Sequence, residues 1–168
     1  MGSDILQQQR EEQRFRHAID YIHEATTGTK KLTTSELSRL NQILTAVTES
    51  SWRSASVQIK IPSGEIYKFN LISDPVDEAR KIIVDAFEIA NNESISAAAV
   101  FLYLQLVQHH LFQDANRRTA SLAAQWLLNS FDHDIDPHEL LKIPLGDVRN
   151  VFEKKKIGEK IRGLIRPR

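Results

Sequence analysis

The chain has 168 residues, of which 41% are hydrophobic and 26% are charged, an ordinary balance for a soluble globular domain. Its 22 Lys and Arg residues equal its 22 Asp and Glu residues, so no net charge draws the whole protein to nucleic acid or to a membrane. The lack of cysteine excludes disulfides, thiolate zinc sites and cysteine nucleophiles. No apolar run reaches the roughly 18 residues of a membrane span, and residues 1–4 lack the basic and apolar regions of a signal peptide.

Two helices are predicted ahead of residue 50. The helical spacing of apolar residues predicts the first over 5–25, and the polar residues 26–29 end it. Thr33 and Glu36 form a capping box that starts the second helix. The predicted buried face of the second helix contains Leu37, Leu40, Ile43, Leu44 and Val47.

The next segment carries the strand signal of the chain. Residues 56–61 and 65–69 alternate polar and apolar side chains, and the Pro-Ser-Gly sequence at 62–64 is typical of a turn. This pattern predicts a two-stranded hairpin. Because an isolated hairpin is marginally stable in water, we expect it to rest on a helical domain as an appended flap.

Helices are predicted for most of the remaining chain. Asp74 and Pro75 are typical of a helix start, and Ser94 or Ser96 is expected to cap the next helix. That helix and the one that follows, up to about residue 131, are apolar nearly all round, which predicts burial on most sides. Asp136 caps a short helix, and a last helical region reaches residue 165 with a possible break at Gly158.

A polar segment separates the two apolar helices. It contains a histidine, a carboxylate, an amide and two arginines, and such groups are costly in a core unless they are paired. We therefore expect this joint to face a cleft and to do chemistry. The residues concerned are His110, Asp114, Asn116, Arg117 and Arg118.

Each residue of this joint has a chemical role that suits its type. His110 can act as a general base, and Asp114 can hold Mg²⁺ together with phosphate oxygens. Asn116, Arg117 and Arg118 open a helix whose free N–H groups favour an anion. The combination predicts phosphoryl or nucleotidyl transfer to a hydroxyl.

Simpler interpretations apply to the residues taken one at a time. An Asp or Asn in a turn is usually a helix cap, and arginines at a helix start are usually solvated. Phe112 is expected to be a structural anchor that fills the core, and His109 is expected not to be catalytic, because neighbours on a helix point about 100° apart. The joint occurrence within nine residues favours a site.

Residues 110–121 resemble the signature of the Fic/Doc family, His-Pro-Phe-x-Asp/Glu-Gly-Asn-Gly-Arg-x-x-Arg. The positions that match are His110, Phe112, Asp114, Asn116 and Arg118. The positions that differ are Leu111, Ala115, Arg117 and Ser121. The Doc branch of the family reads His-x-Phe-x-Asp-Ala-Asn-Lys-Arg-Thr-Ala, and residues 110–120 follow it with arginine for the lysine.

The resemblance implies a mainly α Fic fold, with six to seven helices around two buried core helices and one β-hairpin flap. Residues 1–168 then form a single domain. Its parts are an N-terminal helix in 1–30, a Fic core in 37–130, and C-terminal helices with a basic tail in 131–168.

The resemblance also implies roles for single residues. His110 is the base that deprotonates a target hydroxyl, and Asp114 binds Mg²⁺. The phosphates of a nucleotide, expected to be ATP, are held by Asn116 and Arg118, with Ala115 and Arg117 shaping the same cradle. The flap aligns a segment of the target protein by strand addition. The flap residues concerned are Ile59, Lys60, Ile61, Ile66 and Tyr67.

The departures from the usual signature leave the reaction open. Ala115 and Arg117 replace glycines whose bare backbone approaches the phosphates in enzymes that transfer AMP, and Ser121 replaces a further arginine. Doc, which has similar changes, is a kinase, so phosphorylation of a Ser, Thr or Tyr hydroxyl is slightly favoured over AMPylation. A catalytically degenerate Fic-fold binding module is the third alternative.

Partners and location follow from the same resemblance. No glutamate is followed by Gly or Asn, so the inhibitory motif of many Fic proteins is absent and a separate antitoxin or inhibitor is a possible partner. A cytoplasmic location is expected, with secretion as an effector left open.

The acidic and histidine residues of 132–139 are expected to be loop and cap residues rather than metal ligands. The basic residues of 151–168 are expected to be solvated, so nucleic acid is an unlikely partner.

Overall fold

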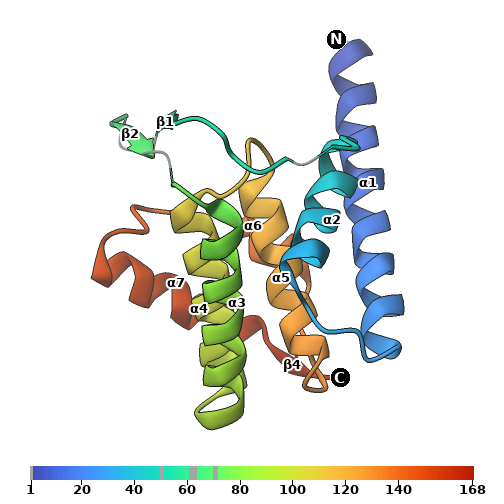
Figure 1. Ribbon diagram of the computed structural model, residues 1–168, viewed down its shortest axis with the longest axis vertical. Coiled ribbons are helices and arrows are strands. Elements are labelled where there is room, and N and C mark those ends of the chain that lie inside the picture. Colours follow the sequence, from blue (N-terminus) through green and yellow to red (C-terminus); the bar gives the residue numbers. More distant parts are fainter. Residues whose placement is uncertain (1, 50, 61–63, 70–71) are drawn as a thin grey trace.

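The computed structural model describes residues 2–49, 51–60, 64–69 and 72–168. Two central helices are surrounded by five others, and a small hairpin stands at one end (Figure 1). The helices are α1 (Gly2–Thr27), α2 (Thr34–Thr45), α3 (Pro75–Asn92), α4 (Ile95–His109), α5 (Asn116–Asn129), α6 (Pro137–Lys142) and α7 (Val151–Leu164). The mainly helical architecture with one β-hairpin that the sequence predicted is confirmed.

The helices α4 and α5 form the centre of the core, as their apolar sequences predicted. Both carry large side chains that are fully buried, including Tyr103 on α4 and Trp126 on α5. The neighbours α3 and α7 pack on α4, whereas α1, α2 and α6 pack on α5. The joint between α4 and α5 therefore has its position fixed by helices on both sides.

Side-chain caps define most helix starts. Thr33 accepts a hydrogen bond from the N–H of Glu36, as the capping box predicted. Asp74, Ser94 and Asp136 cap α3, α4 and α6 in the same way, so Ser94 rather than Ser96 starts the first core helix.

The hairpin consists of β1 (Val57–Lys60) and β2 (Ile66–Phe69), paired antiparallel. Ile59 lies opposite Tyr67, and both are less exposed than their strand neighbours Lys60 and Ile66, which face solvent. The predicted flap residue Ile61 and most of the predicted turn lie outside the described residues. In Figure 1 the hairpin projects at the upper left, beyond the helices.

The C-terminal region departs from the sequence prediction in two ways. Helix α7 continues through Gly158, where an added Cβ would lie 3.1 Å from Val100 Cγ1, so the glycine serves close packing on α4. Two short strands, β3 (His133–Asp134) and β4 (Arg166–Pro167), also pair with each other. Strands of two residues are too short to show alternation, which is why the sequence did not indicate them.

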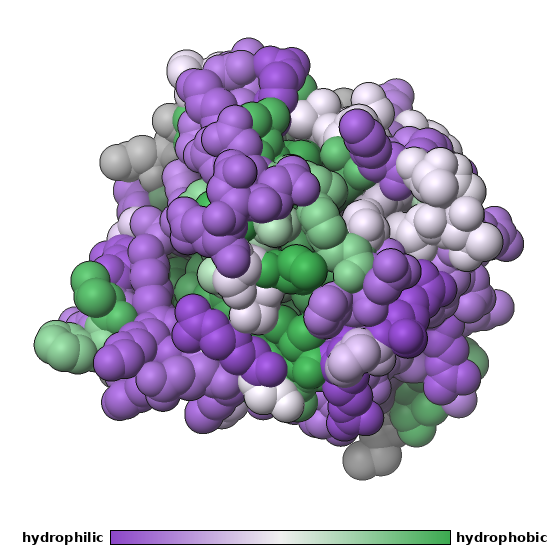
Figure 2. Space-filling model, turned by 90° about the horizontal axis from the view of Figure 1, so that it is seen from below, coloured by the Kyte–Doolittle hydropathy of each residue, from purple (hydrophilic) through white to green (hydrophobic). Residues whose placement is uncertain are grey.

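The end of the molecule seen in Figure 2 is the end opposite the flap. Hydrophilic residues surround a hydrophobic centre on this face. Within the described ranges, no helix combines the length and apolar character that crossing a membrane requires.

A buried amide ties α2 to the joint between the core helices. Asn41 is fully buried, and its Nδ2 donates to the Asp114 carbonyl and to Thr119 Oγ1, each at 2.9 Å. The Asn41 Oδ1 accepts a hydrogen bond from the Ser51 hydroxyl. This one side chain therefore joins α2, the segment before the flap, the joint and α5.

We expect Asn41→Ala to lower the free energy of unfolding by on the order of 3 kcal/mol, because three buried polar groups lose their partner. Urea denaturation would measure the change. The exposed Asn91→Ala is the matched control and should be near neutral. A value for Asn41→Ala close to the control would contradict this role.

Candidate active site

The joint between α4 and α5 begins and ends with unusual backbone conformations. His110 is the C-cap of α4 with φ of 52°, and Ala115 is the N-cap of α5 with φ of 57°, both in the left-handed region. The segment before the flap pairs with the joint: Arg53 N–H donates to the Leu111 carbonyl at 2.8 Å, and Gln113 N–H donates to the Ser51 carbonyl at 3.0 Å. The chain thus reverses its direction between the two helices, and this turn pairs with the short extended segment 51–53.

Two buried groups fasten this turn. The Asn116 amide bonds twice to the Phe112 backbone, accepting from its N–H at 2.8 Å and donating to its carbonyl at 2.9 Å. The Phe112 ring is 2% exposed and stacks on Trp52 with ring centres 4.4 Å apart. Asn116 therefore braces the loop, while Phe112 lies in the core beneath it.

The first turn of α5 has no side-chain cap. Its N-cap is Ala115, which offers no acceptor, whereas α2, α3, α4, α6 and α7 each have a capping side chain. The first N–H groups of a helix and the positive end of its dipole favour an anion when no side chain caps them. The start of α5 is thus suited to phosphate.

His110 lies between this helix start and the flap. Its ring stacks on Phe69 of β2 with centres 4.6 Å apart and planes inclined by 24°. Burial lowers the pKa of His110, and the positive charge of Arg53 lowers it further, although the Val107 carbonyl and Asp114 act in the opposite direction. The lowered pKa favours the neutral imidazole, which is the form that accepts a proton. Its neighbour His109 instead bonds through Nδ1 to the Gln105 carbonyl at 2.9 Å, away from this role.

A cavity of about 220 Å³ opens beside His110. Its walls come from the flap, the end of α4, the start of α5 and the connection between α6 and α7. Arg149 of that connection lies over the Tyr67 ring, with its guanidinium carbon 3.8 Å from the ring centre, and makes a two-point ion pair with Asp147. The flap and this connection therefore form opposite walls that touch.

Asp114 is exposed at the outer edge of the joint. Its Oδ1 accepts from the N–H of Ala115 at 2.5 Å. Within the described residues, no group of three or more acidic or histidine side chains is arranged to bind a metal. A single exposed carboxylate does fit Mg²⁺ bound together with nucleotide phosphates, since that ion commonly takes one or two carboxylates and completes its shell with phosphate and water.

The sequence of this region matches a known family. The sequence profile of the Fic/DOC family covers residues 31–128, which include α2, the flap, the two core helices and the joint. The chain belongs to the Fic/DOC family. No protein with a curated description matches it significantly.

Solved structures with the same fold are distant in sequence. A Fic domain-containing signaling protein from Bacteroides thetaiotaomicron has a TM-score of 0.61 at 17% identity, covering 92% of this chain and 67% of its own. IbpAFic2 covalently tethered to Cdc42 gives 0.60 at 17%, with 96% and 57% covered. The BepC protein of Bartonella tribocorum with bound AMPPNP gives 0.55 at 10%, with 94% and 88% covered. The chain thus spans about two thirds or less of the first two relatives.

The two motif arginines lie on different sides of α5, although the sequence placed both at the phosphate cradle. The Arg117 guanidinium donates to the Tyr103 hydroxyl at 3.2 Å, to the Leu141 carbonyl at 2.7 Å and to the Ile143 carbonyl. Arg118 instead pairs with Glu11 of α1 at 3.3 Å and lines a separate groove of about 510 Å³. Arg117 lines the His110 cavity while its donors hold the end of α6.

Two residues of this site had no assigned role at the level of sequence. Arg53 is buried and donates to the Phe69 carbonyl at 2.9 Å, which links the end of the flap to the segment beside the joint. The sequence alone does not indicate that burial, because arginine is mostly exposed in folded proteins. The contact of Arg149 with Tyr67 likewise depends on a loop whose path the sequence does not reveal.

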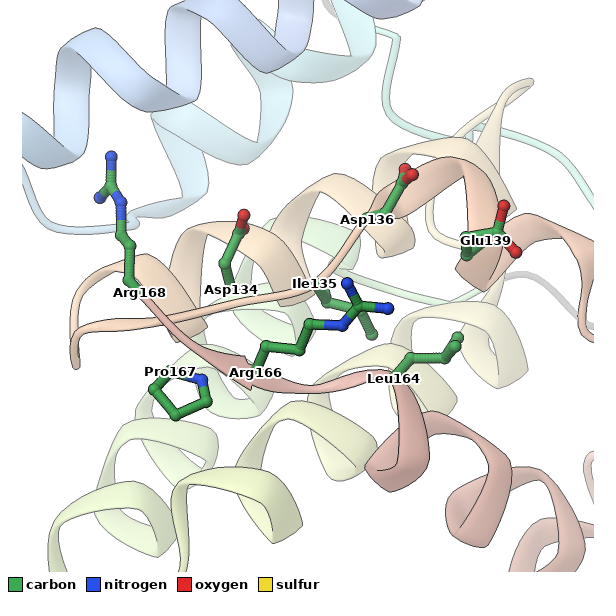
Figure 3. Close-up of a pocket in the computed structure, with 8 residues that line it drawn as sticks. All are labelled: Asp134, Ile135, Asp136, Glu139, Leu164, Arg166, Pro167 and Arg168. Carbon is green, nitrogen blue, oxygen red and sulfur yellow. The ribbon is translucent and has the colours of Figure 1, made fainter.

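A second cavity, of about 260 Å³, lies beside the C-terminal strand (Figure 3). Its carboxylates come from Asp134, Asp136 and Glu139, and Figure 3 shows that these groups do not converge on one point. Asp136 caps α6 and Glu139 pairs with Lys142. Asp136 therefore has the cap role that the sequence suggested and Glu139 has a surface role, while Asp134 accepts a hydrogen bond from Nε2 of the buried Gln125 at 3.3 Å.

We expect Arg117→Met to lower the free energy of unfolding by about 2 kcal/mol, because the carbonyls at the end of α6 lose charged donors. Thermal or urea denaturation would show it, and hydrogen exchange should increase at 143–149. The exposed Arg39→Met is the control. Equal stability of the two variants would show that Arg117 does not hold this connection.

Proposed function

We propose that this protein is a Fic-type transferase. It moves a phosphate-containing group from a nucleotide to a Ser, Thr or Tyr hydroxyl of a target protein. The proposed nucleotide is ATP, and the proposed location is the cytoplasm. The observation that carries the proposal is that the half-buried imidazole of His110, stacked on Phe69 of the flap, lines one cavity with the first residues of α5, a helix with no side-chain cap. A base and an anion site at one joint are the two elements that phosphate transfer to a hydroxyl requires.

The proposed reaction divides the work among residues of the joint. His110 removes the proton of the target hydroxyl as its oxygen bonds to phosphorus, while the bond from phosphorus to the leaving phosphate oxygen breaks. The first N–H groups of α5 stabilise the negative charge of the nucleotide phosphates. Mg²⁺, which Asp114 would hold, supplies further charge neutralisation.

We favour attack on the γ-phosphorus, with ADP as the leaving group. The Arg117 guanidinium donates hydrogen bonds to carbonyls of the protein itself. Ser121, at the place of the second motif arginine, is fully buried and bonds to the Arg118 carbonyl at 2.8 Å. Two phosphate contacts of the usual signature are thus replaced, as in the Doc branch.

Attack on the α-phosphorus, with pyrophosphate leaving, is the second candidate. Its support is the hairpin flap, which the chain shares with the Fic fold, and the BepC structure, which contains the ATP analogue AMPPNP. The same replacements of phosphate contacts support the third reading, a module that binds nucleotide or partner without transfer.

The flap is the proposed docking site for the target segment. Its two strands pair with each other, so the outer backbone edges are available for strand addition. IbpAFic2 was solved tethered to the protein Cdc42, which supports a protein as the acceptor. Ile59, Lys60 and Tyr67 line the cavity, whereas Ile66 faces solvent.

One incubation with ATP labelled at either the α- or the γ-phosphate, with Mg²⁺ and candidate target proteins, tests the proposal. We expect label on a protein from γ-labelled ATP, and its loss in His110→Ala by about a hundredfold or more. Transfer of α-label alone would establish AMPylation instead. If neither α- nor γ-labelled ATP labels a protein, and His110→Ala behaves as the wild type does, the reading as a binding module without transfer would remain.

The Glu11–Arg118 ion pair predicts an effect on nucleotide affinity. A phosphate that binds Arg118 must compete with the Glu11 carboxylate. We therefore expect Glu11→Gln to tighten binding of Mg-ATP by about twofold to fivefold, the range of a partly exposed pair. Calorimetric titration would measure it, with the exposed Glu24→Gln on the same helix as control. An unchanged affinity would show that Arg118 does not contact the nucleotide.

A further inference from the structure

The first turn of α7 carries exposed apolar side chains next to the catalytic cavity. Val151 and Phe152 keep 75% and 77% of their surface in solvent. One residue, Asn150, separates them from Arg149, which lines the cavity and rests on the Tyr67 ring of the flap. Neighbouring apolar side chains that contribute nothing to the core are candidates for an interaction surface.

The same face of α7 continues with basic residues. Exposed positions recur at the spacing i, i+1, i+4 and i+5, which follows one side of a helix. The residues of this solvent face are Val151, Phe152, Lys155, Lys156, Glu159 and Lys160. The opposite side of α7 is buried through Ile157, Gly158 and Ile161. The solvent face is therefore apolar at its start and carries three lysines against Glu159, although one of them, Lys156, pairs with Glu153 at 3.2 Å.

This face is continuous with the proposed target-docking flap. The contact between Arg149 and Tyr67 joins the connection before α7 to β2, and Figure 1 shows the start of α7 below the hairpin at the left. The flap adds two exposed lysines, Lys68 and Lys60, of which Lys60 lines the cavity. Positive charge thus lies on both elements that flank the cavity, which favours a partner of negative charge.

We propose that the solvent face of α7 binds the protein substrate outside the cavity, and that the bound substrate segment is acidic with at least one apolar side chain. The apolar side chain packs against Val151 and Phe152, and the acidic residues lie near the lysines of the next turn. Calling the partner a substrate rests on the proposed transfer reaction, whereas binding at this face does not.

Fluorescence anisotropy with three labelled peptides tests the surface. The peptides have equal length, one Leu and one Tyr, and flanking residues that are Glu, Gln or Lys. We expect the Glu peptide to bind most tightly and its affinity to fall as salt rises. Phe152→Ser should weaken it about tenfold, and Lys155→Gln with Lys160→Gln should reduce the salt dependence. Val84→Ser, which changes a 48% exposed residue on α3, is the control and should have no effect.

Several outcomes would overturn the proposal. Equal affinity for the three peptides would contradict the proposed binding of an acidic segment at this face. Equal binding by Phe152→Ser and Val84→Ser would contradict it as well. A wild-type dimer in sedimentation that Phe152→Ser dissociates would assign the face to a second copy of the chain. Binding to phosphatidylserine vesicles that depends on Phe152, without peptide binding, would assign it to a membrane.

The outcome is separable from that of the transfer reaction. Peptide binding that depends on Phe152 without label from α- or γ-labelled ATP would support the surface and reject the transferase. Label on the three peptides without a preference for Glu would support the transferase and reject the surface.

Discussion

The two hydrogen bonds between the Asn116 side chain and the Phe112 backbone set the geometry on which the rest of the site depends. They close the turn between the core helices while both partners are buried. An amide satisfied in this way stabilises a single loop conformation, because any other would leave its donor and acceptor unpaired in the core. The position of His110 and the direction of the first turn of α5 both follow from that closure.

Net charge conceals how charge is distributed around the joint. The chain is neutral as a whole, yet Arg117 and the start of α5 place positive charge and dipole at one cavity. Burial lowers the pKa of His110 beside this cavity, and the positive charge of Arg53 lowers it further. A setting that suits an anion therefore also favours the neutral imidazole.

Local signals predicted much of the fold. The caps at Thr33, Asp74 and Asp136 involve side chains and N–H groups within three residues, so the sequence contains all that defines them. The apolar character of α4 and α5 predicted their burial for the same reason. Alternation in the hairpin likewise reflects a repeat of two residues within a single strand.

Long-range contacts account for what the sequence did not reveal. Arg117 reaches carbonyls 24 and 26 residues away, and Arg118 reaches Glu11 over 107 residues. Arg118 matches the family signature and Arg117 replaces one of its glycines, but neither fact indicates that the neighbouring helices α6 and α1 separate their directions. A motif therefore indicated the candidate site, while the packing of elements beyond the motif decides what each side chain touches.

The short pairing of β3 with β4 has a practical consequence for fusions to this protein. Arg168 N–H donates to the Asp132 carbonyl at 2.9 Å, which fixes the last residue of the described chain beside the end of α5. That end lies away from the flap, whereas the first turns of α1 lie toward the flap end (Figure 1). A fluorescent protein or affinity handle joined after Arg168 would leave the cavity mouth unobstructed, so immobilisation through this end suits binding measurements.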